Sequence, residues 1–350
     1  MKSIIFTALS LILIFSFNAC SQQIHRDNAV LLDIANSCDF FDEFPDIHTL
    51  SFDKESNGDI PGAITRMNII NDTIYVLDPY KSKAFFAFDK DGNKLFDYSK
   101  IGQGEEEYLF LRDFYCTDRY IYLLDSDSHK ILVLDKSGIY QTKIDVPAHI
   151  AHILPLPSSK TPEFIFDMYS NEKARLLKSK GGRVSDTLML NPDGLGSFLY
   201  LPLQVFQPSN MEDYEWLYMP SYSSIVYKLS NTGNIEDYMA IDFNGLLPDI
   251  EIFKSLKGLK YKEKERKIRE YAYDYGFFIS NGNIIISFFY EDRLYLNFIN
   301  TELKQVKTFN LSSNYYPVLY SDGKIYFITS DNDDITVVNV STLNTNIQSI

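Results

Sequence analysis

The feature that most constrains the fold of this 350-residue chain is an internal repeat. The stretch Ile74–Asp78 returns 47 positions later as Ile121–Asp125, with a similar order of apolar residues and the same final aspartate. A second apolar run follows each stretch and ends at Gly92 in the first copy and at Gly138 in the second. Short β-branched and aromatic runs separated by polar turns are typical of hairpin-linked β-strands.

Further copies continue the series to the end of the chain. Their clearest apolar runs are Phe164–Asp167, Glu215–Tyr218, Val226–Leu229, Asn283–Ser287 and Lys324–Ile328. A period of 40 to 50 residues with several strands per unit indicates a β-propeller, because one such unit cannot bury both faces of its sheet alone. The 282 residues from 62 to 343 accommodate six units, and the abundance of Tyr (25) and Phe (26) suits strands. The sequence therefore predicts an all-β, six-bladed propeller.

The ring is expected to close with a strand from the opposite end of the chain. Asp46–Phe52 alternates polar and apolar residues, and the last unit is short and polar after Ser341. We therefore predict that Asp46–Phe52 completes the last blade. Strand alternation also predicts that Ile74 and Val76 face one side of their sheet and Tyr75 and Leu77 the other.

The first twenty residues have the pattern of an export signal. A short basic start is followed by the apolar run Ile4–Phe17, which is short for a membrane span and suits a signal peptide. The sequence up to Cys20 resembles a bacterial lipobox, which implies cleavage after residue 19 and a lipid on Cys20. An ordinary cleaved signal peptide is the alternative. The expected organisation is a signal peptide at 1–19, a lipid-attached tether at 20–45 and a propeller at 46–350.

The segment between the first two units carries a family resemblance. Gly102, Gln103, Gly104, Glu107 and Tyr108 match the Gly-Gln-Gly-Pro-Gly-Glu-Tyr segment of six-bladed propeller lipoproteins of Bacteroidota, which are related to NHL and TolB-like propellers. Glu105 and Glu106 depart from that segment. The resemblance implies a propeller in the cell envelope, lipid-anchored to the outer membrane. The residues after Cys20 lack an acidic export cluster, which favours a periplasm-facing position.

Two groups of residues are candidates for ligand binding. Connections between blades lie at the faces of a propeller, so the loop containing Gln103, Glu105, Glu106, Glu107 and Tyr108 is one candidate, with a solvated acidic loop as the alternative. The expected innermost strands, 63–67, 113–116 and 277–280, contain few carboxylates. Arg66 and Tyr115 on these strands form the second candidate.

The aspartates that recur with the repeat, Asp78, Asp125 and Asp167, have two interpretations. They form either a ring of cation-binding carboxylates or a set of turn residues that accept backbone hydrogen bonds, and a residue repeated in register favours the second. His149 and His152 are poorly spaced to share a metal on one strand. Cys38 and Cys116 either pair or remain thiols. We predict no metal site and no cofactor.

Residues 246–273 interrupt the period. Glu251–Tyr273 is expected to be helical, and from Lys254 to Glu270 it holds eight basic and three acidic residues, while the whole chain has a net charge of −14. Such an insertion suits docking to a partner, covering of the central channel or contact with anionic lipid, and a merely solvated helix is the alternative. The candidate docking residues are Lys260, Lys264, Arg266 and Lys267.

The functional expectation is a non-enzymatic envelope lipoprotein whose propeller binds a partner protein or a glycan. A Ca²⁺-dependent propeller hydrolase of the lactonase or arylesterase kind is the alternative, and it requires several carboxylates on the innermost strands. The acidic charge disfavours nucleic acid as a partner. The expected membrane contact is the N-terminal lipid, and the sequence leaves the oligomeric state open.

Overall fold

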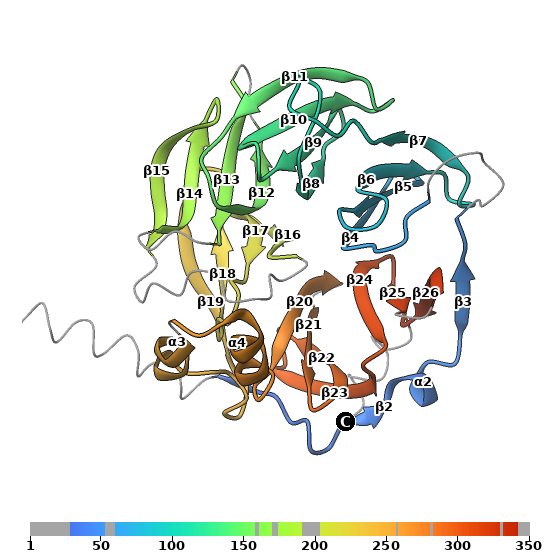
Figure 1. Ribbon diagram of the computed structural model, residues 1–350. Helices are drawn as coiled ribbons and strands as arrows, with labels where there is room; N and C mark the ends of the chain where they lie inside the picture. The colour runs from blue at the N-terminus through green and yellow to red at the C-terminus, as the bar shows by residue number, and fades with distance from the viewer. Residues whose placement is uncertain are drawn as a thin grey trace, which may run out of the picture.

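The computed structural model describes residues 29–52, 60–157, 161–169, 174–190, 204–256, 258–280, 283–329 and 332–341. In this part of the chain six β-sheets are arranged around a central axis, as Figure 1 shows. Each sheet is one blade, and the first strand of each blade lies nearest the axis. The six-bladed propeller predicted from the repeat is confirmed.

The first three blades follow the repeat closely. Blade 1 contains β4 (Arg66–Ile70), β5 (Thr73–Asp78), β6 (Ala84–Phe88) and β7 (Lys94–Tyr98). Blade 2 contains β8 (Leu111–Cys116), β9 (Tyr120–Asp125), β10 (Lys130–Asp135) and β11 (Tyr140–Asp145). Blade 3 contains β12 (Ile150–Leu156), β13 (Glu163–Met168), β14 (Ala174–Lys180) and β15 (Arg183–Leu190).

The last three blades are less regular in sequence but equivalent in structure. Blade 4 contains β16 (Phe206–Met211), β17 (Tyr214–Tyr218), β18 (Ile225–Leu229) and β19 (Ile235–Asp242). Blade 5 contains β20 (Tyr273–Ser280), β21 (Asn283–Tyr290), β22 (Arg293–Asn300) and β23 (Gln305–Ser312). Blade 6 contains β24 (Tyr315–Ser321), β25 (Lys324–Thr329) and β26 (Asn332–Asn339), together with β3 (Ile47–Leu50).

The ring closes as the sequence predicts. Strand β3 pairs antiparallel with β26, with His48 opposite Val337 and Leu50 opposite Ile335. The first residues of the propeller thus supply the outermost strand of its last blade. This arrangement removes an open sheet edge that would otherwise be available to another chain.

The apolar core consists of layers between consecutive blades. Ile74 and Val76 pack with residues of blade 6, while Tyr75 and Leu77 pack with residues of blade 2, so the predicted alternation of faces is confirmed. Phe85 of blade 1, for example, meets Phe114 of blade 2 with ring centroids 5.0 Å apart. The many aromatic residues therefore fill the wedges between sheets, where large planar groups bury much area.

The chain before β3 runs along the outside of the ring. Strand β1 (Val30–Leu31) pairs in parallel with β19, and β2 (Cys38–Asp39) pairs in parallel with β23. The short helix α2 (Phe40–Glu43) follows and buries Phe40 between blades 5 and 6. Much of the stretch expected as a tether thus packs on blades 4 and 5, whereas the predicted signal peptide and Cys20 lie outside the described residues.

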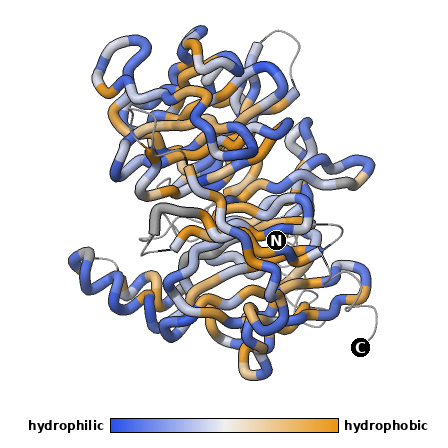
Figure 2. Tube along the Cα trace, turned by 90° about the vertical axis from the view of Figure 1, so that its right-hand side faces the viewer, coloured by the Kyte–Doolittle hydropathy of each residue, from blue (hydrophilic) through white to orange (hydrophobic). Residues whose placement is uncertain are grey.

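The insertion between blades 4 and 5 contains two helices rather than the single helix expected over Glu251–Tyr273. Helix α3 (Ile250–Leu256) and helix α4 (Tyr261–Ile268) form a hairpin, and Tyr273 begins β20. The chain turns at Gly258, whose φ of +86° lies in the left-handed region. Figure 2 shows this mainly hydrophilic hairpin projecting from one face of the disc. We call α3, α4 and their connection the helical hairpin.

Three smaller features of the described residues concern the start of β4, the two cysteines and the character of the helices. Strand β4 begins at Arg66, and shortly before it the backbone N–H groups of Gly62 and Ala63 donate to the Asp78 carboxylate. Cys38 is exposed and Cys116 is buried, and both are free thiols. No helix among the described residues has the length and apolar character needed to cross a membrane.

Candidate functional site

Two of the recurring aspartates hold the backbone of their own blades. Asp78 accepts hydrogen bonds from Gly62 N at 2.7 Å and Ala63 N at 3.0 Å, and also from the turn that follows β5. Burial by itself raises the pKa of Asp78, but the bonds from Gly62, Lys81 and Ser82 outweigh it and lower that pKa. Asp125 likewise accepts from the backbone that leads into β8. These contacts support turn chemistry rather than a ring of cation ligands.

Asp167 is at the equivalent position of blade 3 but binds side chains. Its Oδ2 lies 3.0 Å from His152 Nδ1, and its Oδ1 lies 3.0 Å from Arg175 Nε. Tyr218 of blade 4 donates to the same Oδ1 at 2.7 Å. Burial raises the pKa of Asp167, but Arg175, His152 and Tyr218 together lower it below its usual value. The contacts with Arg175, His152 and Tyr218 thus favour the ionised form of this buried carboxylate.

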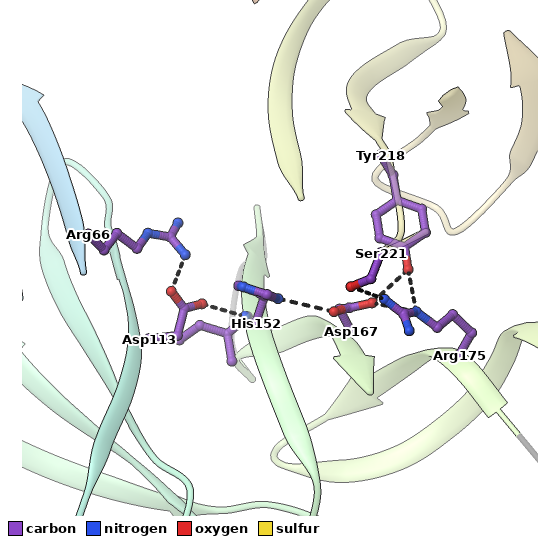
Figure 3. A network of polar contacts seen from close by, with 8 residues as sticks. Arg66, Asp113, His152, Asp167, Arg175, Tyr218 and Ser221 are labelled. Atoms are coloured by element: carbon purple, nitrogen blue, oxygen red, sulfur yellow. Dashed lines mark hydrogen bonds and ion pairs between the residues drawn. The ribbon is translucent and has the colours of Figure 1, made fainter. Parts of the chain in front are cut away.

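A second buried carboxylate connects the first three blades. Arg66 on β4 forms an ion pair with Asp113 on β8, and the other oxygen of Asp113 accepts a hydrogen bond from Ile153 N on β12 at 2.8 Å. Asp113 is 1% exposed, while 13% of the Arg66 side chain remains exposed near the axis. Figure 3 shows this contact next to the Asp167 cluster, so polar contacts extend from blade 1 to blade 4.

Two glutamines continue these contacts around the axis. Gln207 on β16 donates to the carbonyl of Phe277 in blade 5 at 2.9 Å. Gln204, just before β16, donates to the carbonyl of Val318 in blade 6 at 3.4 Å. We define the polar girdle as Arg66, Asp113, His152, Asp167, Arg175, Gln204, Gln207 and Tyr218. It links the inner parts of all six blades.

The chemistry of the polar girdle is that of a structural network. Each of the two carboxylates in the polar girdle faces a guanidinium group, with Arg66 on Asp113 and Arg175 on Asp167. Within the described ranges, no three His, Cys, Asp or Glu side chains are grouped closely enough to hold a metal ion. The sequence placed Asp113 on an expected innermost strand but predicted neither its pairing with Arg66 nor the buried pairing of Arg175 with Asp167. The signal for Arg175 was its place beside Leu176 and Leu177, because a charge in a buried strand requires a partner.

The predicted loop between blades 1 and 2 is held by contacts within the loop and with neighbouring residues. Glu107 accepts from Gly104 N at 2.7 Å, Glu106 pairs with Lys100, and Glu105 accepts from the hydroxyl of Tyr140. Tyr108 is buried and donates to the carbonyl of Lys83, so it is a core residue and not a solvent-facing one. Gln103 is exposed, as are Glu105 and Glu106.

Arg66 and Tyr115, the other predicted pair, lie close to each other on the innermost strands. Burial raises the pKa of the Tyr115 hydroxyl, and the nearby charge of Arg66 opposes that rise. The Tyr115 ring meets Trp216 of blade 4 edge-on, with centroids 6.1 Å apart. The guanidinium of Arg66 lies 5.5 Å from the centroid of the Phe114 ring. Both side chains therefore contribute to packing near the axis.

The structure also contains a cavity that the sequence did not predict, at the closing seam between blades 6 and 1. It has a volume of about 350 Å³. Its polar lining comprises His48, Thr49, Asp72, Lys90, Asp322, Lys324 and Tyr326, and its apolar wall comprises Leu50, Ile69, Ile74 and Val337. We call it the seam pocket. Its lining comes from strands at opposite ends of the propeller, so no local motif identifies it.

The six blades and their closing strand define the class of this protein as a six-bladed β-propeller. The sequence matches the family model DUF5128, described as a 6-bladed beta-propeller, over residues 21–338. The chain belongs to this family.

Solved structures show the same fold at low sequence identity. An exported protein of Bacteroides fragilis superposes with a TM-score of 0.71 and 12% identity, covering 89% of this chain and 99% of its own. A DUF4221 family member from Bacteroides vulgatus gives a TM-score of 0.57 and 9% identity, with coverage of 85% and 96%. No curated protein matches the sequence. At these identities the structures establish the fold and leave the ligand open.

Proposed function

We propose that this chain is a non-enzymatic binding protein of the cell envelope and that the seam pocket binds a glycan. In the same proposal a lipid on Cys20 attaches the protein to the outer membrane on its periplasmic side. The similarity to an exported Bacteroides protein and the lipobox-like sequence support this location. The seam pocket is the observation that carries the binding function.

The lining of the seam pocket suits a polar ligand without a strong net charge. Asp72 and Asp322 offer hydrogen-bond acceptors, and Lys90 and Lys324 offer donors, so both signs of charge are represented equally. Sugar hydroxyls both donate and accept, and they can use both sets of groups. Tyr326 and the aliphatic wall supply the apolar surface on which the C–H face of a sugar ring can rest.

The volume and concave shape of the seam pocket favour a glycan over a folded protein partner. Small-ligand sites are concave and have volumes of roughly 300 to 1,000 Å³, a range that includes this hollow. The hydrolase alternative requires carboxylates near the axis that are free to bind Ca²⁺. Asp113 and Asp167 are each committed to an arginine, which favours binding over that chemistry.

A glycan array probed with the chain from residue 21 onward tests this function. We expect retention of a limited set of oligosaccharides, and we expect Tyr326→Ala to weaken the best one by about tenfold or more, as measured by titration calorimetry. Tyr316→Ala, at an exposed tyrosine on β24, is the matched control and should bind normally.

Specific results would contradict the glycan site or the non-enzymatic role. If no oligosaccharide is retained, or if Tyr326→Ala binds as well as Tyr316→Ala, the seam pocket is not a glycan site. If the bound oligosaccharide is cleaved during incubation, with the products separated by chromatography, the chain is an enzyme and the non-enzymatic proposal is wrong.

A further inference from the structure

The helical hairpin carries a positive charge that the rest of the chain does not share. From Lys254 to Glu270 the sequence has a net charge of +5, within a chain of −14. Some of these charges pair locally, with Lys254 on Glu251 and Arg269 on Glu265. Lys260, Lys262 and Arg266 are exposed, and the apolar residues Phe253, Leu256 and Ile268 face one another inside the hairpin. The outer surface of the hairpin is therefore basic.

The base of the hairpin is also where the N-terminal segment joins the propeller. Val30 pairs with Ile241 and Leu31 with Asp242, the last residues of β19 before the insertion begins. Ala272 N donates to the carbonyl of Leu246 at 2.9 Å, which closes the base of the insertion. Val30 and Leu32 belong to the same apolar cluster as Leu246 and Ala272.

The length of chain before β1 limits how far this base can be from a lipid on Cys20. Val30 lies ten positions after Cys20, and an extended chain spans at most about 3.3 to 3.6 Å per residue. A lipid on Cys20 therefore keeps the root of the hairpin within roughly 35 Å of the bilayer. Electrostatic attraction to a membrane acts within about one Debye length, near 8 Å at physiological salt. A lipid on Cys20 therefore keeps the hairpin near the bilayer, and a small movement then brings its basic side chains into contact with the lipid headgroups.

The charge distribution also selects which part of the propeller approaches the membrane. An anionic lipid surface attracts basic side chains and repels an acidic surface. Outside the hairpin the chain is strongly acidic, so the hairpin is its favourable contact. Figure 1 places α3 and α4 at the junction of blades 4 and 5, clear of the axis, which disfavours a role in covering the channel.

We propose that the helical hairpin binds the anionic lipid headgroups of the membrane that carries the lipid on Cys20. The lipid and the basic surface then act as two anchoring signals, a combination that holds a protein more firmly than a single weak anchor. The contact also fixes the orientation of the ring relative to the bilayer. This inference rests on the proposed membrane attachment and is independent of glycan binding in the seam pocket.

Vesicle sedimentation with the unlipidated chain from residue 21 onward tests the contact. This chain contains every described element and the whole family match. We expect it to bind vesicles containing phosphatidylglycerol, to bind phosphatidylcholine vesicles at least about tenfold more weakly, and to be released by salt. The variant carrying Lys260→Gln, Lys264→Gln, Arg266→Gln and Lys267→Gln should lose at least about tenfold in affinity for the anionic vesicles.

The matched control removes the same number of charges elsewhere, by Lys81→Gln, Arg119→Gln, Lys143→Gln and Lys180→Gln on blades 1 to 3. It should bind anionic vesicles nearly as well as the unchanged chain. Thermal unfolding of both variants confirms that each is folded. Equal binding by the hairpin variant, or equal loss in the control, would overturn the proposal.

Two further experiments distinguish lipid attachment at Cys20 and protein docking at the hairpin from the proposed headgroup contact. Incorporation of a labelled fatty acid in cells, with and without Cys20→Ala, reports on lipid attachment alone, so its failure is distinct from failure of the vesicle assay. Crosslinking in cells tests a protein partner. If the hairpin variant loses one crosslinked protein while vesicle binding is unchanged, the hairpin is a protein-docking surface and the lipid contact is wrong.

Discussion

Asp78, Asp125 and Asp167 occupy equivalent positions in three consecutive blades, yet the third has different partners. In the first two blades the carboxylate caps backbone N–H groups, which is how an aspartate serves a turn. In blade 3 the carboxylate is buried with Arg175, His152 and Tyr218. The recurrence predicted the shared role, but the exception depends on residues 8, 15 and 51 positions away along the chain.

Loss of Arg175 should reveal how much the Asp167 cluster depends on charge pairing. Arg175→Met leaves the buried carboxylate without its guanidinium, and we expect a loss of about 3 to 5 kcal/mol in the free energy of unfolding. Urea denaturation followed by fluorescence measures this loss. Arg183→Met, at an exposed arginine on the next strand, should change stability by about 0.5 kcal/mol or less. A similarly small effect for Arg175→Met would contradict the ionic role.

At the scale of elements, the strands were predictable and the connections less so. The alternation in runs such as Ile74–Asp78 requires a sheet with two buried faces, and each such run is a strand in the structure. The basic insertion gave a helical pattern, but in the structure the helix breaks at Gly258, whose φ is +86°, and Phe253 and Leu256 pack against Ile268. This packing depends on how the two ends of the insertion meet, which strand periodicity does not encode.

The N-terminal segment before β3 provides an element-scale prediction. Phe40 is buried, and its ring lies 5.6 Å from Phe327 of blade 6 and 5.8 Å from Phe309 of blade 5, centroid to centroid. Phe40→Ala should therefore cost about 3 to 5 kcal/mol, as measured by urea denaturation. Leu31→Ala, at an exposed residue of β1, should cost much less. Equal effects would show that α2 does not form part of the core.

At the scale of the whole molecule, the ring depends on β3. A chain starting at residue 53 lacks this strand and exposes the edge of β26, so we expect it to self-associate and to unfold at a lower temperature. A chain starting at residue 45 keeps β3 while losing β1, β2 and α2, and it serves as the control. Sedimentation velocity measures association. A monomeric chain from residue 53 that unfolds at the same temperature as the chain from residue 45 would contradict the role of the closing strand.

The sequence by itself determined the number of blades, the strand that closes the ring and the faces of the strands, because these follow from a period of about 47 residues and an alternation of two. Only the tertiary structure decided which polar residues meet. The polar girdle joins Arg66 to Asp113 and Asp167 to Tyr218, and the seam pocket joins His48 to Lys324. Such contacts depend on the closure of the ring, which brings residues from distant repeats together. The sequence of a single repeat therefore does not predict them.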